Sequence, residues 1–335
     1  MKKLSYLCLS ILMIGALSQV VAAKAKTWRA VHLLDYNTDD ALETLGQNLE
    51  NLSRQGINTI ILEVDYNFAF KSHPELRRGN APITPEGAKK FANLCKKLNI
   101  RLIPEFQSLG HQSWKAETFS LLTVYPKFDL TPGAFPNNEG IYCREWDPLN
   151  ADVWKVVFQL MDEIIDAFHA DAFHVGMDEV FLLGHEQSPS TKGKDPAVLF
   201  ADAVKQLHSH LKGKKVEMLM WADRLIDGNK YQMGEWESSI NGTAGAVDLI
   251  PKDIIVCPWH YEVRDSYPSI PMFIEKGFRV LPAGWKDVEA MKALIGFSQK
   301  NSNARLLGFM FTTWGVKKDA LTEFPPLVEG LKLLQ

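Results

Sequence analysis

TDDALETLGQNLENLSRQGINTIILEV, residues 38 to 64, reads as an amphipathic helix followed by a buried strand. Thr38 is suited to cap the helix, and two aspartates follow it in the first turn, where the helix dipole favours negative charge. One face is apolar and Gly56 is suited to end the helix, the apolar positions being Leu42, Leu45, Leu49 and Leu52. The run 57–64 is then almost continuously apolar, as is typical of a parallel strand covered on both faces. This stretch predicts a helix-then-strand unit of an α/β fold.

The same alternation continues along the chain. Apolar, β-rich runs occur eight times, at 27–34, 57–64, 100–106, 171–176, 216–221, 253–259, 278–283 and 306–314. Helical patterns separate most of them, at 38–56, 84–99, 152–168, 196–213, 268–277, 288–299 and 327–334. Eight alternating units predict an α/β fold with a single (β/α)8 TIM barrel over residues 24–335, because about 250 residues plus insertions is usual for that fold.

Two doubly wound half-domains are the alternative architecture. Against it, no G-x-G-x-x-G follows the first strand, and no linker rich in Pro, Gly and Ser divides the chain. The segment 107–149 departs from the rhythm as a long loop rich in aromatic residues, and loops of this length are usually functional.

Residues 1–23 have the pattern of a secretory signal peptide. Lys2 and Lys3 precede an apolar stretch from about Leu4 to Leu17, and small residues follow at 22 and 23. The apolar stretch is too short to span a bilayer, so we expect cleavage, a periplasmic or secreted location, and no transmembrane segment in the mature chain. An uncleaved membrane anchor is the alternative.

Charge and cysteine content restrict the partners. The formal net charge is −3 with no basic block, which argues against nucleic acid or an anionic membrane as a partner. Cys95, Cys143 and Cys257 lack C-x-x-C spacing, so one disulfide is possible and a disulfide framework is not. Oligomeric state is left open.

Polar and aromatic residues gather where the predicted strands end. In a (β/α)8 barrel the active site is built at the C-terminal ends of the strands. The residues found there are Glu63, Asp65, Glu105, His111, His174, Asp178, Glu179, Trp221, Asp223, Trp259, His260, Tyr261, Trp285 and Trp314. Acids from the early strands and tryptophans from the later ones suit a sugar, because aromatic faces cover its C–H faces while carboxylates and imidazoles bind its hydroxyls.

Each of these residues also has a purely structural interpretation. A single Trp is as often core as binding surface, and Glu63 can pair inside the barrel. His111, His174 and His185 suggest a zinc set, but they lack the H-E-x-x-H spacing, so neither a metal nor a cofactor is expected. Asp178 and Glu179 are adjacent, and in a strand they would point to opposite faces. Because they follow Gly176, where the strand is ending, both are expected to turn toward the barrel mouth.

HVGMDEV (174–180) resembles the H-x-G-x-D-E segment of glycoside hydrolase family 20, the β-N-acetylhexosaminidases. IPEFQSLGH (103–111), MWADRL (220–225) and FMFTTW (309–314) resemble its third, fifth and eighth strands. The likeness is greatest to the hexosaminidase D type, through RAVHLLD (29–35), DEVFLLG (178–184) and PWHY (258–261).

The resemblance implies a retaining, substrate-assisted glycosidase acting on N-acetylhexosaminides through an oxazolinium intermediate. Asp178 would hold the acetamide and Glu179 would act as the general acid and base. The other residues implied in substrate binding are Asp65, Glu105, His111, His174, Trp221, Asp223, Trp259, Tyr261 and Trp314. Gluco or galacto preference, aglycone, linkage and exo or endo action are left open.

Three departures from the family pattern concern hydroxyl recognition. LLDYNTDD (33–40) lacks the Arg that many members place after the first strand, LPAGWKD (281–287) lacks the Tyr after the seventh, and TTWGV (312–316) lacks the acid after the eighth. Tyr261 is the candidate for the missing Tyr role. Two other classes stay open: a non-catalytic sugar-binding barrel, because the missing Arg and Tyr weaken the pocket, and a metal-dependent hydrolase that uses the His and Asp residues at the rim.

Overall fold

The computed structural model describes residues 27 to 334, and the expected signal peptide, 1–23, lies outside them. The strands of the main sheet are all parallel and occupy the expected runs. They are β1 (Trp28–Leu33), β2 (Thr59–Glu63), β3 (Arg101–Ser108), β6 (Ala172–Gly176), β7 (Glu217–Trp221), β8 (Ile255–Cys257), β9 (Arg279–Val280), β10 (Ala283–Gly284) and β11 (Gly308–Thr312).

The sheet closes through the seventh run. Its order is β10-β11-β1-β2-β3-β6-β7-β8-β9, and the two ends of this order, β9 and β10, are consecutive pieces of one chain segment. β9 pairs with β8, whereas β10 pairs with β11, and Pro282 falls between the two pieces. Because Pro has no N–H to donate to a ladder, it accounts for the interruption. The single (β/α)8 barrel is confirmed, with its seventh strand split in two.

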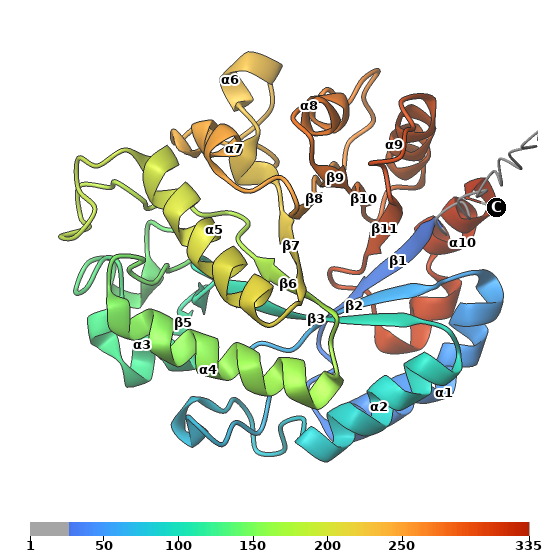
Figure 1. The fold of residues 1–335 in the computed structure, drawn as a ribbon, viewed down its shortest axis with the longest axis horizontal. Helices are drawn as coiled ribbons and strands as arrows, with labels where there is room; N and C mark the ends of the chain where they lie inside the picture. Colours follow the sequence, from blue (N-terminus) through green and yellow to red (C-terminus); the bar gives the residue numbers. More distant parts are fainter. Residues whose placement is uncertain (1–26, 335) are drawn as a thin grey trace, which may run out of the picture.

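Helices surround the sheet (Figure 1). Seven correspond to the predicted patterns: α1 (Asp39–Gln55), α2 (Pro85–Lys97), α4 (Ala151–Phe168), α5 (Pro196–Gly213), α8 (Ser269–Glu275), α9 (Val288–Lys300) and α10 (Pro325–Leu333). Shorter pieces were not predicted. These are α3 (Ser120–Val124), α6 (Gly228–Tyr231), α7 (Ala246–Leu249), the hairpin β4 (Ser113–Trp114) and β5 (Glu117–Thr118), and 3₁₀ turns at Pro74–Leu76, Pro126–Phe128, Pro136–Asn138, Asp223–Leu225, Thr243–Gly245 and Lys318–Glu323.

The opening stretch of sequence folds as its pattern predicts. The Thr38 hydroxyl accepts from the Ala41 N–H, and Gly56 ends α1 with φ 113°, a conformation that favours glycine. The four leucines of the apolar face are buried against the sheet.

The barrel interior is layered. An apolar layer includes Ala30, Ile61, Ile103, Ala172 and Leu219. The inward residue two positions further along each of these strands lies closer to the mouth, and there the layer becomes polar and aromatic: His32, Glu63, Glu105, His174 and Trp221. The strands themselves therefore carry both the apolar core of the barrel and, nearer the mouth, the polar and aromatic layer.

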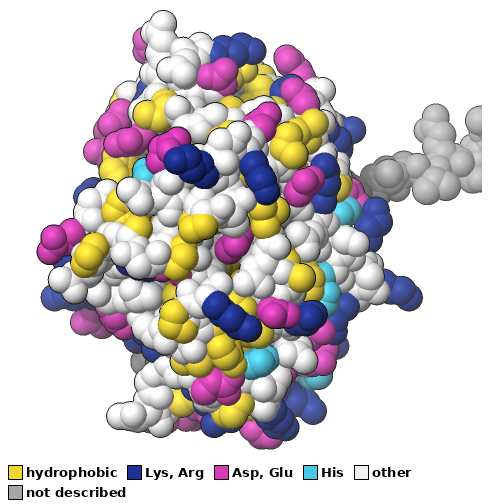
Figure 2. All heavy atoms as spheres, turned by 90° about the vertical axis from the view of Figure 1, so that its left-hand side faces the viewer, with side chains coloured by type: hydrophobic (Ala, Val, Ile, Leu, Met, Phe, Trp, Pro, Cys, Tyr) yellow, Lys and Arg dark blue, Asp and Glu magenta, His cyan; other side chains and the backbone are white. Residues whose placement is uncertain are grey.

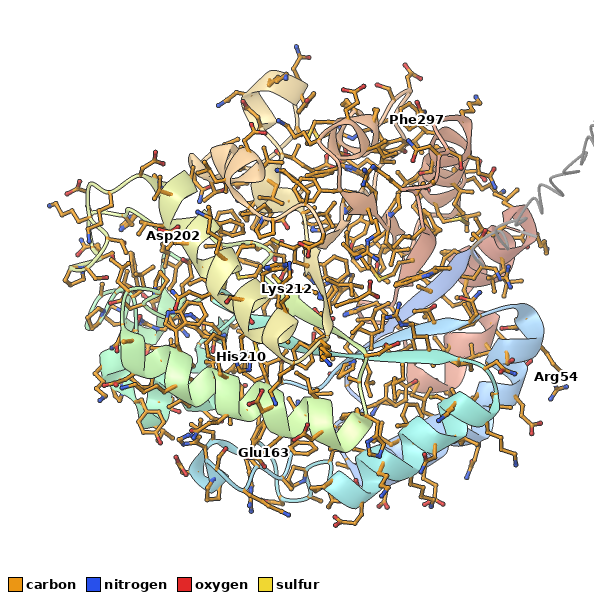
Figure 3. All side chains as sticks on the ribbon, in the orientation of Figure 1. Arg54, Glu163, Asp202, His210, Lys212 and Phe297 are labelled. Carbon is orange, nitrogen blue, oxygen red and sulfur yellow. The ribbon has the colours of Figure 1, made fainter. Side chains whose placement is uncertain are left out.

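The outer surface carries both signs of charge. On the face drawn in Figure 2, acidic and basic side chains are interspersed with small apolar patches. His210 points from α5 toward α4 (Figure 3), stacks on Phe158 at 4.0 Å and contacts Asp162 at 2.7 Å. None of the helices within residues 27–334 has the length and apolar character to span a bilayer.

Candidate active site

A cavity of about 980 Å³ lies at the C-terminal ends of the strands. Every strand of the barrel except the split-off β9 is followed by residues that line it, among them Asp35 after β1, Asp65 after β2, His111 after β3, Glu179 after β6 and Trp314 after β11. This size lies at the upper end of the range for pockets that enclose a drug-sized ligand, roughly 300–1,000 Å³. The cavity therefore offers room for more than one sugar ring.

Asp178 and Glu179 turn to the same side because the backbone leaves the strand at once. Gly176, Met177 and Glu179 all have positive φ, at 66°, 74° and 50°. Gly176 also permits close packing, because a Cβ there would lie 1.9 Å from Gln107 Oε1. As a result both carboxylates face one imidazole: His111 Nε2 lies 3.3 Å from Asp178 Oδ2 and 3.2 Å from Glu179 Oε2.

Buried carboxylates hold the loop that carries Asp178 and Glu179 in place through hydrogen bonds to its backbone. The Glu179 N–H donates to Asp223 Oδ2 at 2.9 Å, and the N–H groups of Phe181 and Leu182 donate to Glu145 Oε1 at 2.5 and 2.7 Å. Burial disfavours the charged imidazolium, but neighbouring acidic groups, Asp178 foremost, raise the pKa of His111 well above its usual value. The three side chains thus form a compact group in which the histidine bridges two acids.

A fully buried polar layer lies under the cavity floor. Glu105 accepts from His32 Nε2 at 2.7 Å and from Trp221 Nε1 at 3.1 Å, and it lies 3.1 Å from His174 Nδ1. Burial alone would raise the pKa of Glu105, but His174 and His32 hold it well below its usual value. The carboxylate therefore stays charged, fixing the edge of Trp221, whose ring reaches the cavity.

Two further acids reach the cavity, Glu63 at the end of β2 and Asp65 just after it. Burial raises the pKa of Glu63 well above its usual value, and Asp65 raises it further. Burial also raises the pKa of Asp65 to about 7, although its Oδ1 accepts from the Gln107 N–H at 2.7 Å. Both shifts favour the neutral carboxyl groups, which can donate a hydrogen bond to a ligand oxygen.

The opposite wall is aromatic. Trp259 and Tyr261 stack at 5.0 Å, Trp314 Nε1 donates to the Tyr261 hydroxyl at 2.9 Å, and Trp285 Nε1 donates to the Trp314 carbonyl at 2.9 Å. Trp221 closes the set, 6.3 Å from Trp314. Burial raises the pKa of Tyr261, so its hydroxyl stays a neutral donor. A flat apolar group flanked by a polar edge fits such a wall.

The comparisons with known proteins agree on one family. The sequence model of the glycosyl hydrolase family 20 catalytic domain matches residues 62–314. The chain belongs to glycosyl hydrolase family 20. Among curated relatives it is 26% identical over 186 residues to hexosaminidase D of Bos taurus, covering 51% of this chain and 48% of that protein. It is 22% identical over 164 residues to lacto-N-biosidase of Bifidobacterium bifidum, covering 45% and 14%.

Solved structures of family 20 share the fold. The Flavobacterium johnsoniae chitobiase aligns with a TM-score of 0.69 at 20% identity, over 92% of this chain and 48% of that one. The exo β-N-acetylglucosaminidase of Vibrio harveyi, solved with N-acetylglucosamine, aligns with a TM-score of 0.64 at 15% identity, over 92% and 54%. The chain thus spans about half the length, or less, of the relatives cited here.

The structure divides the predicted site residues of this family 20 chain into two layers. Those on the cavity wall are Asp65, His111, Asp178, Glu179, Trp221, Trp259, Tyr261 and Trp314. Glu105, His174 and Asp223 do not line the cavity but lie buried behind it. The alternation of side chains along a strand could not separate the two layers. It predicts which face of the sheet a side chain is on, but not whether that side chain reaches the cavity or stays buried beneath it. Cys95, Cys143 and Cys257 are free and buried.

One compact set among residues 27–334 could hold a metal ion. Ligand atoms of His111, Asp178 and Glu179 lie within 4.8 Å of one another. The suggested trio of His111, His174 and His185 is not brought together, since His174 is turned to Glu105 beneath the floor.

Sequence reasoning missed several residues of the wall: Asp35, Arg78, Trp114, Tyr142, Trp236, Glu237 and Arg264. Trp114 and Tyr142 belong to the long loop expected to be functional. Trp236 lies in the segment between β7 and β8, where no long helix forms. A Trp in a long loop on the catalytic face of a barrel was the available signal.

Proposed function

We propose that this chain is a β-N-acetylhexosaminidase that cleaves with retention by a substrate-assisted mechanism. The observation that supports the proposal most directly is the convergence of Asp178 and Glu179 on His111 at the edge of an aromatic-walled cavity. The two carboxylates lie on the same side, as suits a reaction in which the substrate supplies the nucleophile that a second, opposing carboxylate provides in most retaining glycosidases.

In the first step the carbonyl oxygen of the 2-acetamido group attacks the anomeric carbon. The bond from that carbon to the glycosidic oxygen breaks, and Glu179 donates its proton to the departing oxygen. Asp178 accepts a hydrogen bond from the acetamide N–H, which strengthens the carbonyl as a nucleophile. The product is a bound oxazolinium ion.

In the second step Glu179, now a carboxylate, removes a proton from water. The water oxygen attacks the anomeric carbon and the oxazolinium ring opens, so the acetamide is restored and two inversions give net retention. His111 bridges the two acids and keeps them oriented. Trp221, Trp259, Tyr261 and Trp314 enclose the ring and its acetamide, while Asp65 donates to or accepts from a hydroxyl.

Hydroxyl recognition at the far end of the ring is proposed to rely on carboxyl groups. Leu34 and Asp35 after β1, Trp285 after β10 and Gly315 after β11 line the cavity. These are the strands after which the family resemblance leads us to expect an Arg, a Tyr and an acid, respectively. Tyr261 lies 5.3 Å from Trp285, next to the expected position of the missing Tyr. Protonated Glu63 and Asp65 can supply the donors that an Arg would otherwise give. Export remains a proposal from residues 1–23.

The test uses aryl β-glycosides of N-acetylglucosamine, N-acetylgalactosamine and glucose. Glu179→Gln is expected to lower kcat by about 10²–10⁴-fold, and Asp178→Asn to lower it selectively on the acetamido substrates. N-acetylglucosamine thiazoline should inhibit. Equal activity of the wild-type enzyme on the plain glucoside would contradict substrate assistance. Binding without hydrolysis across a broad pH range would favour a sugar-binding barrel instead, and loss of activity with a chelator would favour metal-dependent hydrolysis.

A further inference from the structure

Glu145 is a fully buried acid that the proposed mechanism does not use. Its Oε1 accepts from the N–H groups of Phe181 and Leu182 at 2.5 and 2.7 Å, shortly after Glu179 in the sequence. Residues 177–182 belong to no helix or strand, so helical or ladder hydrogen bonds do not fix their backbone. An N–H group withdrawn from water needs a partner, and here the Glu145 carboxyl supplies it. The position of Glu179 therefore depends on a side chain from a distant part of the sequence.

The segment that carries Glu145 also contacts the loop of His111. The His111 N–H donates to Cys143 Sγ at 3.3 Å. The Cys143 thiol in turn faces the Glu179 carbonyl oxygen at 3.8 Å. Residues 143–145, here called the clasp segment, thus touch both of the loops whose side chains meet where His111 Nε2 lies 3.2 Å from Glu179 Oε2.

The clasp segment is itself held in place by its middle residue, Arg144, which is buried. Arg144 Nη1 donates to Asp129 Oδ2 at 2.6 Å. Its Nη2 donates to the carbonyls of Ala134 and Phe135 at 2.9 and 2.8 Å. Catalytic groups must be held close to their productive geometry, and side chains with several fixed hydrogen bonds provide such support. The neighbouring Glu145 is therefore a firm anchor for the backbone that it contacts.

We propose that Glu145 is a positioning residue for Glu179, because by holding the backbone after Glu179 it keeps that carboxyl where it can protonate the departing oxygen. The inference rests on the proposed function. Glu145 does not line the cavity, so it acts through the backbone and does not touch the substrate. Proton transfer requires hydrogen-bond reach, about 2.6–3.2 Å between heavy atoms, so a small shift of the loop weakens proton donation. Most of the cavity wall comes from other strands and stays in place.

A purely structural role is the alternative, and the chain offers a matched example of it. Glu163 on α4 (Figure 3) accepts from the N–H groups of Lys71 and Ser72 at 2.7 and 2.8 Å. Like Glu145 it joins two consecutive N–H groups of a loop, but none of these three residues lines the cavity. Glu163→Ala is therefore the control for losing such a pair of hydrogen bonds without moving a catalytic group.

The test compares kcat/KM on the methyl and the dinitrophenyl β-glycosides of N-acetylglucosamine. Methanol departs only with a proton from the general acid, whereas dinitrophenolate is stable enough to leave without one. Glu145→Ala is expected to lower kcat/KM on the methyl glycoside by roughly 10–100-fold, and on the dinitrophenyl glycoside by less than about threefold. A change that only loosens the fold would lower both values alike.

Two further variants of Glu145 show whether position is what matters. Burial raises the pKa of Glu145 to about 7, although both N–H groups lower it, so burial favours a neutral side chain there. Glu145→Gln presents a carbonyl oxygen to the same two N–H groups and should recover most of the loss. Glu145→Asp is one methylene shorter and can reach these groups only if the loop moves, so it should lose activity as selectively as Glu145→Ala. It carries the test should the Ala variant not fold.

The outcomes separate this inference from the proposed function. If the wild-type protein hydrolyses neither glycoside, or if Glu179→Gln loses equally on both, the proposed function fails. If Glu179→Gln is selective but Glu145→Ala and Glu145→Asp lose nothing, or lose equally on both glycosides as Glu163→Ala should, Glu145 has only a structural role. A loss in Glu145→Gln as large as that in Glu145→Ala would also overturn the inference, because it would show that Glu145 supplies charge and not position.

Discussion

Replacing Arg224 with Met should reveal how strongly a buried ion pair supports the active site. Arg224 and Asp223 are adjacent residues with fully buried side chains, and Arg224 Nε donates to Asp223 Oδ2 at 2.7 Å. The same Asp223 oxygen accepts from the Glu179 N–H, while Arg224 holds the loop of Trp236. One guanidinium therefore links the proposed catalytic acid to the mouth of the cavity.

The expected loss in the free energy of unfolding follows from the buried Asp223 charge that Met leaves unpaired. Removing one partner of a buried ion pair costs about 3–5 kcal/mol, because the other charge stays buried without compensation. Met preserves length and packing against Phe181, over whose ring the guanidinium lies at 4.6 Å. We therefore expect a loss of about 4 kcal/mol in the free energy of unfolding at pH 8, a large part of the roughly 5–15 kcal/mol of a typical domain.

The loss should depend on pH in a known direction. Burial raises the pKa of Asp223 to about 6 against the opposing effect of Arg224, so without Arg224 it rises further. A carboxyl whose pKa is higher in the folded state favours folding at low pH, and this contribution disappears as pH rises through the folded pKa. At pH 5 the Asp223 carboxyl is neutral in the variant. The loss in the free energy of unfolding should then fall to the contribution of the hydrogen bonds that the charged guanidinium donated, about 1.5–3 kcal/mol.

Urea unfolding followed by tryptophan fluorescence at pH 5 and pH 8 measures both values. Asp223→Asn combined with Arg224→Met removes the buried charge and should recover part of the stability at pH 8. A loss below about 1 kcal/mol, or an equal loss at both pH values, would refute the reasoning, since it would show that Asp223 is solvated or neutral regardless of Arg224.

Three further changes probe the layers of the site. Asp65→Asn should raise the melting temperature at pH 8 and leave it nearly unchanged at pH 4, because a pKa of about 7 makes ionised Asp65 unfavourable in the folded state at high pH; a rise that is equal at both pH values would contradict this. Glu105→Gln should lower the free energy of unfolding at pH 7 by about 3–5 kcal/mol and shift tryptophan emission, since Trp221 loses a charged acceptor; unchanged emission would show that Trp221 does not depend on it. Gly176→Ala should lower the free energy of unfolding by about 1–3 kcal/mol because of its φ of 66°, and by more because the new Cβ would collide with Gln107 Oε1. Adding Gln107→Ala should recover only the loss due to the collision, and full recovery would mean that the backbone carries no strain.

The barrel could be predicted from sequence because its signals are local. Helix caps, leucine spacing and apolar runs each depend on a few neighbouring residues, as the capped, leucine-faced α1 shows. The seventh strand was predicted as one run, but its division at Pro282 depends on hydrogen bonds to β8 on one side and β11 on the other. Such partners are known only once the barrel is closed.

In the candidate site, too, local sequence patterns predict which residues lie near strand ends, but their final positions depend on how the strands pair. Glu105 and Asp65 are both acidic residues near the C-terminal end of a strand. Glu105 is nevertheless buried between two histidines, whereas Asp65 reaches the cavity. What separates them is the register between β2 and β3, where Glu63 pairs with Glu105 while Asp65 lies beyond the end of the ladder. Because Asp65 has left the strand with φ 47°, its side chain turns into the cavity. Asp178 and Glu179 likewise follow the end of β6, and they too reach the cavity, whereas Glu105 and His174, which pair with each other within the ladder, stay buried beneath the floor.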